Sequence, residues 1–251
     1  MHPEIFEDDV FLVSYPKSGN TWLKFIFANY LTQENIDFTR VHSIIPEFES
    51  VRNDIEKRDF TPRIFKSHSS YSNRFNKVIY IVRDGRDVAV SYFFYLKKTH
   101  VIPQNSSFSH FLDLYINGEI PYGKWSDHVN GWINISKTSQ QVKVISYESL
   151  LTDTTTIVTE LIQFIGWELE QERLSKAIEN ASFSALSSKE KENHDIDRHL
   201  KNTNKEIPFI RKGVSGDYVN YFSIEENQIF SQKNRPLYQK LNTLFQNNYH
   251  I

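Results

Sequence analysis

The hydrophobic positions along the chain predict a series of strands. Residues 11–13 form a short apolar run that ends at Ser14-Tyr15-Pro16, and residues 78–82 form a continuous β-branched run. Unbroken apolar runs of this kind are typical of strands buried on both faces of a sheet. Residues 63–66 and 142–146 are predicted to be two further strands.

Helical patterns separate these strands. Apolar residues recur at helical spacing over residues 22–31 and cover nearly every side of that helix, as in a buried helix. Residues 87–98 and 224–245 are predicted to be helices, and another helix ends at Gly166. Because strands alternate with helices, we expect an α/β fold with a parallel central sheet flanked by helices.

The chain shows no internal repeat and no obvious domain break, so a single domain over residues 1–251 is predicted. Residues 187–206 are polar and lack clear periodicity. A polar stretch of this kind can fold over a bound ligand, and we expect residues 187–215 to act as a mobile lid. The aromatic run at residues 92–95 is expected to belong mainly to the core.

Composition narrows the class of protein. The 251 residues are 39% hydrophobic and 24% charged, which is typical of a packed globular protein. With 29 Lys and Arg against 31 Asp and Glu, the net charge of −2 argues against nucleic acid or an anionic membrane as partner. There is no Cys, which excludes disulfides and thiolate zinc sites, and no apolar run approaches the roughly 18–20 residues of a membrane span. A cytoplasmic location is predicted, and any anion site must be local.

The turn after the first strand is the first candidate for chemistry, with the sequence Ser14-Tyr15-Pro16-Lys17-Ser18-Gly19-Asn20-Thr21-Trp22. A helix N-terminus at the carboxyl edge of a parallel sheet favours an anion. Gly19 permits close backbone approach, and Lys17 adds a full charge. The alternative is an ordinary polar helix cap. The motif is not a P-loop, because Lys17 precedes Gly19.

Arginines follow the best strand in Arg83-Asp84-Gly85-Arg86-Asp87, with Ser91 about two helical turns beyond Arg83. Guanidinium groups at such an edge suit a phosphate dianion. The alternative is a surface ladder in which Asp84 and Asp87 neutralise both arginines.

Two shorter motifs complete the set of candidates. His68 in Lys66-Ser67-His68 ends the second strand and is a candidate general base, although most single histidines are structural. The stretch Arg211-Lys212-Gly213-Val214-Ser215-Gly216-Asp217 is basic and glycine-bearing, and taken alone it is also consistent with a solvated turn.

In this order and spacing the four motifs resemble those of the sulfotransferases that use 3'-phosphoadenosine 5'-phosphosulfate (PAPS). The family's Tyr-Pro-Lys-Ser-Gly-x-Thr-Trp matches residues 15–22, its strand–Arg–helix–Ser element matches residues 78–91, and its Lys-Thr-His matches residues 66–68. Its late Arg-Lys-Gly-x-x-Gly-Asp-Trp matches residues 211–218. The resemblance covers about residues 11–223. It implies a P-loop-NTPase-like core with a PAPS-binding strand–loop–helix, and the product adenosine 3',5'-bisphosphate (PAP).

The resemblance also implies roles for individual residues. His68 would be the general base, with Lys66 beside the transferring group, and Ser91 would draw Lys17 toward the 3'-phosphate side until the acceptor binds. The remaining implied nucleotide contacts are Lys17 with Ser18, Gly19, Asn20, Thr21 and Trp22 for the 5'-phosphosulfate, Trp22 and Phe183 for the two faces of adenine, Tyr147 for its amino edge, and Arg83, Ser91, Arg211, Lys212 and Gly213 for the 3'-phosphate.

We expect sulfuryl transfer to need no metal, because a sulfuryl group carries less negative charge than a phosphoryl group and repels a nucleophile less. Lys17 and backbone N–H groups would then stabilise the charge on the leaving oxygen. The sequence His194-Asp195-Ile196-Asp197-Arg198-His199 holds possible metal ligands, but it is expected to be part of the polar lid segment.

Several positions depart from the family pattern. Ser69-Ser70 replace the usual Leu-Pro after the base, and Tyr218 replaces Trp. The family's dimer motif falls on residues 219–228 and is not kept, so the oligomeric state is left open.

The acceptor is expected to be a hydroxyl, or an amine, of a small molecule or glycan, with candidate contacts at His68, Phe94, Tyr122 and Trp125. Two alternatives remain at this point. One is a non-catalytic protein that binds adenosine 3',5'-bisphosphate. The other is a nucleotide kinase, which would usually need a P-loop and a carboxylate that holds a metal.

Overall fold

The computed structural model describes residues 4–51, 60–194 and 200–246. Within them a four-stranded sheet contains β1 (Val10–Ser14), β2 (Ile64–Ser67), β3 (Lys77–Val82) and β4 (Val142–Ser146) in the order β2-β1-β3-β4. Every neighbouring pair is parallel, as predicted. The carboxyl ends of all four strands therefore meet at one edge of the sheet.

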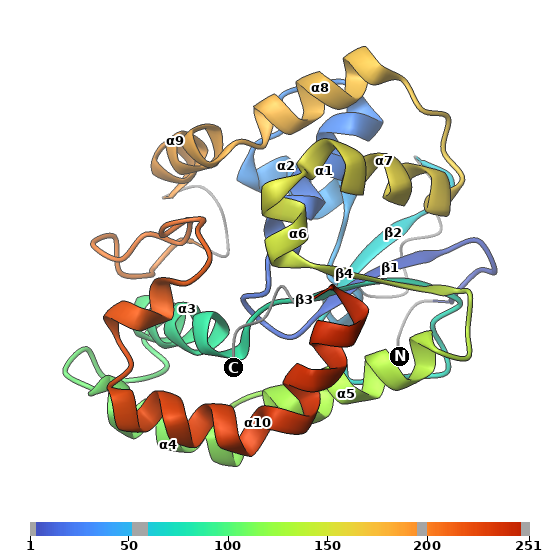
Figure 1. Ribbon diagram of the computed structural model, residues 1–251. Coiled ribbons are helices and arrows are strands. Elements are labelled where there is room, and N and C mark those ends of the chain that lie inside the picture. The colour runs from blue at the N-terminus through green and yellow to red at the C-terminus, as the bar shows by residue number, and fades with distance from the viewer. Residues whose placement is uncertain (1–3, 52–59, 195–199, 247–251) are drawn as a thin grey trace.

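Helices cover both faces of this sheet (Figure 1). They are longer and more numerous than the sequence pattern predicts, because short amphipathic helices give a weak periodic signal. On one side lie α1 (Asn20–Thr32), α2 (Phe38–Ile44), α6 (Tyr147–Thr152), α7 (Thr154–Ile165) and α8 (Gln171–Asn180), and on the other lie α3 (Gly85–Lys98), α4 (Phe108–Asn117), α5 (Trp125–Ser136) and α10 (Ile224–Leu244).

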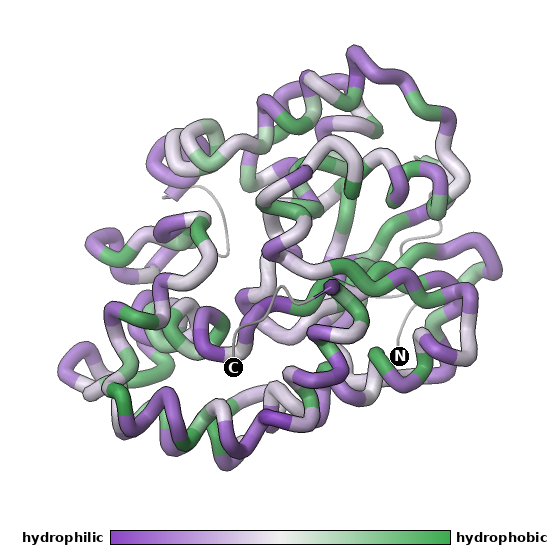
Figure 2. Tube along the Cα trace, viewed as in Figure 1, coloured by the Kyte–Doolittle hydropathy of each residue, from purple (hydrophilic) through white to green (hydrophobic). Residues whose placement is uncertain are grey.

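Alternate residues of the strands pack into two separate hydrophobic cores, one on each face of the sheet. Phe11 and Val13 of β1 pack into the core under α3, α4, α5 and α10, whereas Val10 and Leu12 pack into the core under α1, α7 and α8. All of β1 is buried, which explains its unbroken apolar run. In Figure 2 the central strands are mostly green, and the outer helices α8 and α10 alternate purple and green.

Helix ends fix the loops at the carboxyl edge. Helix α1 starts directly after Gly19, which has a φ of 105°. Helix α3 starts after Asp84, whose side chain accepts a hydrogen bond from the backbone N–H of Arg86. The predicted helix end at Gly166 is confirmed, because Gly166 is the left-handed C-cap of α7.

The polar stretch that begins at Ser187 is not irregular throughout, because α9 (Phe183–Asn193) continues into it. Glu190 of α9 is buried, forms an ion pair with Lys98 of α3 and accepts hydrogen bonds from the backbone N–H groups of Phe209 and Ile210. These contacts tie the end of α3, α9 and the following segment together beside the sheet edge. That residues 187–215 move as a lid stays a prediction.

Candidate active site

A cavity of about 520 Å³ opens at the carboxyl edge of the sheet, between α1, α3, α6, α9 and residues 209–214. Every residue that the sequence resemblance assigned to catalysis or nucleotide binding lines it, except Ser18, which is buried. The cavity is also lined by residues that the sequence did not single out for the site, among them Pro16, Glu47, Tyr92, Tyr95, Leu96, Pro121, Phe209 and Ile210.

The loop between β1 and α1 is shaped as an anion cradle. Lys17 and Gly19 both have positive φ angles, 70° and 105°, which turn the backbone sharply before the first helical N–H groups. The Asn20 amide braces this turn by donating to the Leu12 carbonyl at 3.0 Å and the Ser14 hydroxyl at 3.2 Å. Among the described residues, Ser18 Oγ and Asn20 Oδ1 are buried without a hydrogen-bond partner. These two side-chain oxygen atoms therefore remain able to form hydrogen bonds when a ligand is bound.

Gly19 permits this close approach, and an alanine there is expected to weaken nucleotide binding at least tenfold. A Cβ at position 19 would lie 2.6 Å from Cδ2 of the buried Tyr147 ring, at a φ that L-residues avoid. Isothermal calorimetry of Gly19→Ala with PAP measures the effect. Gly131→Ala is the control, because its Cβ would meet Tyr71 at an ordinary 3.5 Å. Equal PAP affinity in both variants would refute this role of Gly19.

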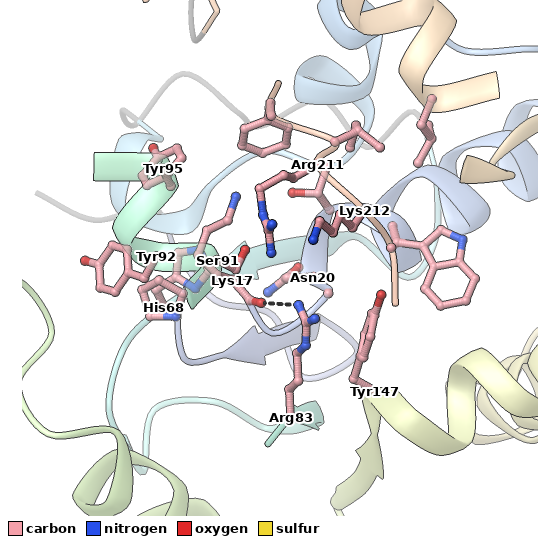
Figure 3. Close-up of a pocket in the computed structure, with 18 of the residues that line it drawn as sticks. Lys17, Asn20, His68, Arg83, Ser91, Tyr92, Tyr95, Tyr147, Arg211 and Lys212 are labelled. Atoms are coloured by element: carbon pink, nitrogen blue, oxygen red, sulfur yellow. Dashed lines mark hydrogen bonds between the residues drawn. The ribbon is translucent and has the colours of Figure 1, made fainter. Parts of the chain in front are cut away.

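Lys17 lines the cavity, and its side chain extends toward Tyr95 (Figure 3). Its Nζ is 4.5 Å from the ring centroid of Tyr95 and 4.0 Å from that of Phe209. Burial, followed by the positive charges of Lys66 and Arg83, lowers the pKa of Lys17 to about 7. A bound anion would stabilise the protonated form of Lys17 and raise its pKa again, so the site favours an anionic ligand.

Arg83 lines the cavity and links the loop of Lys17 to the loop of Val214. Its guanidinium donates to the Lys17 carbonyl at 3.2 Å and the Val214 carbonyl at 2.8 Å, and it lies 4.2 Å from the Tyr147 ring centroid. Its buried Nε has no partner among the described residues. Arg86 behaves differently: it pairs with Asp84 at 2.6 Å and stacks on Tyr218, away from the cavity. Of the two arginines proposed for the phosphate, only Arg83 reaches the site.

Arg211 and Lys212 enter from the opposite side, as Figure 3 shows. Each pairs with Asp217 at 2.7 Å. The loop that carries them is fixed to α3 by Asp87, which accepts hydrogen bonds from the backbone N–H groups of Gly216 and Tyr218. Asp87 is therefore an anchor for this loop and does not neutralise Arg83 by direct pairing.

The aromatic groups expected to hold adenine also border the cavity. Trp22 packs edge-on against Tyr147 with ring centroids 6.0 Å apart. Phe183, at the start of α9, is 46% exposed, and a Cβ on Gly213 would meet its ring at 2.7 Å. Flat, partly exposed rings that line the cavity provide stacking surfaces for a base.

His68 has a defined tautomer. Its Nδ1 lies 2.7 Å from the Ser14 carbonyl oxygen, and because a carbonyl can only accept, Nδ1 carries the proton. The Nε2 lone pair is then available as an acceptor. Burial, followed by the nearby Lys66, lowers the pKa of His68 to about 3, so the imidazole is neutral at physiological pH. His128 fixes the backbone beside it, because its Nε2 lies 3.1 Å from the His68 carbonyl and its Nδ1 lies 2.9 Å from the Tyr80 hydroxyl.

Two of the expected acceptor contacts are wrong. Trp125 is only 2% exposed and packs under Gly85, Phe230 and Tyr238, within the core. Phe94 does not line the cavity, because it lies behind Arg211, whose guanidinium is 4.8 Å from its ring centroid. The aromatic run of α3 instead presents Tyr92 and Tyr95 to the cavity, and Tyr122 lines it as predicted.

Within residues 4–51, 60–194 and 200–246, no three or more His, Asp or Glu side chains gather closely enough to hold a metal ion. Residues 195–199, which hold the other possible metal ligands of the run that begins at His194, lie outside the described part of the chain. No helix in that part is both long and apolar enough to cross a membrane.

The parallel sheet, the anion cradle and the cations around it define an α/β protein. Its cavity at the carboxyl edge of the sheet is suited to binding an anionic ligand of the size of a nucleotide. The family model described as "Sulfotransferase domain" matches residues 7–243. The chain belongs to this family and is a PAPS-dependent sulfotransferase.

Similarity to known members extends over most of the chain. It is 32% identical to "Sulfotransferase 1E1" of Bos taurus over 239 residues, which cover 89% of this chain and 81% of that protein. It is 29% identical to "Sulfotransferase 2A1" of Homo sapiens, covering 91% and 83%. Among solved structures, mouse sulfotransferase SULT7A1 complexed with PAP matches with a TM-score of 0.70 and 29% identity, covering 92% of this chain and 85% of the other. Family membership does not favour the non-catalytic or kinase alternatives.

Proposed function

We propose that this enzyme transfers the sulfuryl group of PAPS to a hydroxyl of a small molecule, with His68 as the general base. The position of His68 carries the proposal: a neutral imidazole with Nε2 unprotonated borders the cavity that holds Lys17 and Arg83. A base must be unprotonated and within reach of the hydroxyl that it deprotonates. The Ser14 carbonyl supplies this tautomer and orients the ring.

The other side chains divide between nucleotide binding and charge stabilisation. We propose that Arg83, Arg211, Lys212 and Ser91 hold the 3'-phosphate, since three cations and a hydroxyl line the cavity from different sides. Lys17 and the backbone N–H groups of residues 18–22 would hold the 5'-phosphosulfate. When sulfate is transferred, negative charge grows on the oxygen that leaves with the phosphate, and Lys17 stabilises it there. Lys66 would neutralise the sulfuryl oxygens.

The acceptor is tested by a screen with labelled PAPS across phenols, alcohols, amines and glycans. We expect sulfation of small hydroxyl compounds, because tyrosines and a proline surround the space in front of His68. A crystal structure with PAP and the best acceptor would then measure the distance from His68 Nε2 to the acceptor oxygen. Transfer to none of these classes, or an imidazole remote from the acceptor, would contradict the proposal.

Ser91 is expected to restrain wasteful hydrolysis. It lines the cavity from α3, one helical turn before Tyr95, which contacts Lys17. If Ser91 holds Lys17 toward the 3'-phosphate until the acceptor binds, Ser91→Ala will release sulfate from PAPS several-fold faster without acceptor. Ser175→Ala, on the exposed face of α8, is the control. Unchanged hydrolysis by Ser91→Ala would count against this role.

A further inference from the structure

Charge is distributed unevenly along the cavity. Lys17, Arg83, Arg211 and Lys212 gather around the nucleotide end. Beyond His68 the wall is formed largely by the rings of Tyr92, Tyr95 and Tyr122 with Pro121. Glu47 is the one acidic residue that lines the cavity within the described part of the chain, and it belongs to none of the sulfotransferase motifs recognised in the sequence.

The backbone of Glu47 is fixed against the sheet edge. Residue 47 forms an isolated parallel bridge with Lys66 of β2, and the Lys66 N–H donates to the Pro46 carbonyl at 2.9 Å. The Glu47 carboxylate pairs with the Lys66 ammonium, and its side chain is 26% exposed. It is held in place while still facing the cavity.

The charge of Glu47 reaches the space in front of His68. Pairing with Lys66 outweighs burial and lowers the pKa of Glu47 to about 2, so the group is a carboxylate at neutral pH. Burial is the largest cause that raises the pKa values of Tyr95 and Tyr122. The negative charge of Glu47 is the next cause at Tyr95, and at Tyr122 it acts after the charge of Glu49. An acceptor bound between these two rings would therefore lie in the electrostatic field of the Glu47 carboxylate.

We propose that Glu47 makes this enzyme select acceptors that carry a protonated amine in addition to the reacting hydroxyl. The inference rests on the proposed function, because it assigns the wall in front of His68 to the acceptor. The exposed Tyr122 ring stabilises an ammonium group further through cation–π attraction, whereas the Tyr95 ring already contacts the Lys17 ammonium. Anionic acceptors are disfavoured at the same wall.

The reason lies in the partner of Glu47. Lys66 is needed by the sulfuryl oxygens when PAPS is bound, and they compete with Glu47 for its positive charge. A partly buried carboxylate that loses its partner is costly, and an acceptor ammonium group offsets that loss. A neutral acceptor leaves Glu47 poorly compensated, and a carboxylate acceptor adds repulsion.

Glu49 provides a matched comparison two residues away. Its Oε1 accepts hydrogen bonds from the hydroxyls of Ser67 and Ser69, and it does not line the cavity. Glu47→Gln and Glu49→Gln each remove one negative charge from the same short segment. Only the first removes it from a side chain that lines the cavity, although the charge of Glu49 also reaches Tyr122.

The test uses three phenols of similar shape: tyramine, 4-ethylphenol and 4-hydroxyphenylacetate, with charges of +1, 0 and −1 at neutral pH. We expect kcat/KM to favour tyramine over 4-ethylphenol about tenfold, a free-energy difference of about 1.4 kcal/mol. In Glu47→Gln the ratio should fall close to 1, and in Glu49→Gln it should fall much less, because Glu49 acts on Tyr122 from outside the cavity. The ratio of kcat/KM for tyramine to that for 4-ethylphenol reports selectivity only. If Glu47 merely holds Lys66 in place, Glu47→Gln should lower kcat/KM for all three phenols alike and leave this ratio unchanged.

Equal kcat/KM values for the three phenols in the wild type, or an unchanged ratio in Glu47→Gln, would overturn the proposal. Calorimetry of the three phenols with the PAP-loaded protein tests the same selectivity without turnover. Failure to transfer sulfate to any hydroxyl compound would refute the proposed function, and the calorimetric order would still decide the role of Glu47.

Discussion

Replacing His68 with glutamine is expected to lower kcat for sulfate transfer by about 10²–10⁴-fold, the usual contribution of a positioned general base. Glutamine keeps a polar side chain at the carboxyl end of β2 but cannot accept a proton at neutral pH. The nucleotide contacts come from other elements, so the affinity for PAP should stay within about twofold. Steady-state kinetics with labelled PAPS and calorimetry with PAP measure the two effects separately.

His110→Gln is the matched control for this experiment, because His110 is exposed on α4 and lies outside the cavity. It should retain full activity. If His68→Gln turned over at the wild-type rate with PAP affinity intact, another group would have to take the acceptor proton. A joint loss of activity and PAP affinity would instead assign His68 to nucleotide binding.

Removing the Lys17 charge is expected to have the second large effect. Lys17→Met should lower kcat by about 10²–10³-fold, because the leaving oxygen loses its preorganised cation. It should also weaken PAP binding, since a buried positive charge among anion-binding groups is lost. Lys176→Met is the control, because Lys176 is 70% exposed on α8 and pairs only with the similarly exposed Glu172. Equal kinetics for these two variants would contradict the role of Lys17.

The low pKa of Lys17 gives this prediction a pH signature. Lys17 binds an anion in its protonated form, and in the free enzyme the fraction protonated falls as the pH rises through about 7. PAP affinity should therefore drop tenfold or more between pH 7 and pH 9, a range in which the phosphates of PAP are already ionised. Lys17→Arg remains protonated and should flatten this dependence. A flat profile in the wild type would show that Lys17 is not the titrating group.

Much of the fold follows from local sequence pattern. The buried strands β1 and β3 are predicted because both of their faces are covered, which produces unbroken apolar runs. Helices α2, α8 and α9 were not predicted, since they are short or carry mixed polar faces. In α9, Lys189 and Glu190 are buried charges whose partners lie on other elements, and a local pattern cannot show them.

The site was predicted to a similar extent. Lys17, Arg83, His68 and Arg211 lie at motif positions, and the cavity brings them together. Trp125 was wrongly predicted to contact the acceptor. The sequence shows a tryptophan near a site motif, but it does not show that the ring packs against Gly85 in the core. Glu47 was missed because nothing in its own segment marks it, and only its bridge to Lys66 brings it to the cavity.

By itself, the amino-acid sequence determined the α/β class, the four strands in their order along the chain with the longer helices between them, and the chemical groups available for an anion. These features depend on periodicity and on short motifs, which need no knowledge of distant contacts. Tertiary structure alone decided that Arg83 enters the cavity while Arg86 turns away, that His68 presents Nε2, and that Glu47 faces the acceptor wall. The reason is that each of these outcomes depends on partners far away in the chain, and only folding brings those partners within bonding distance.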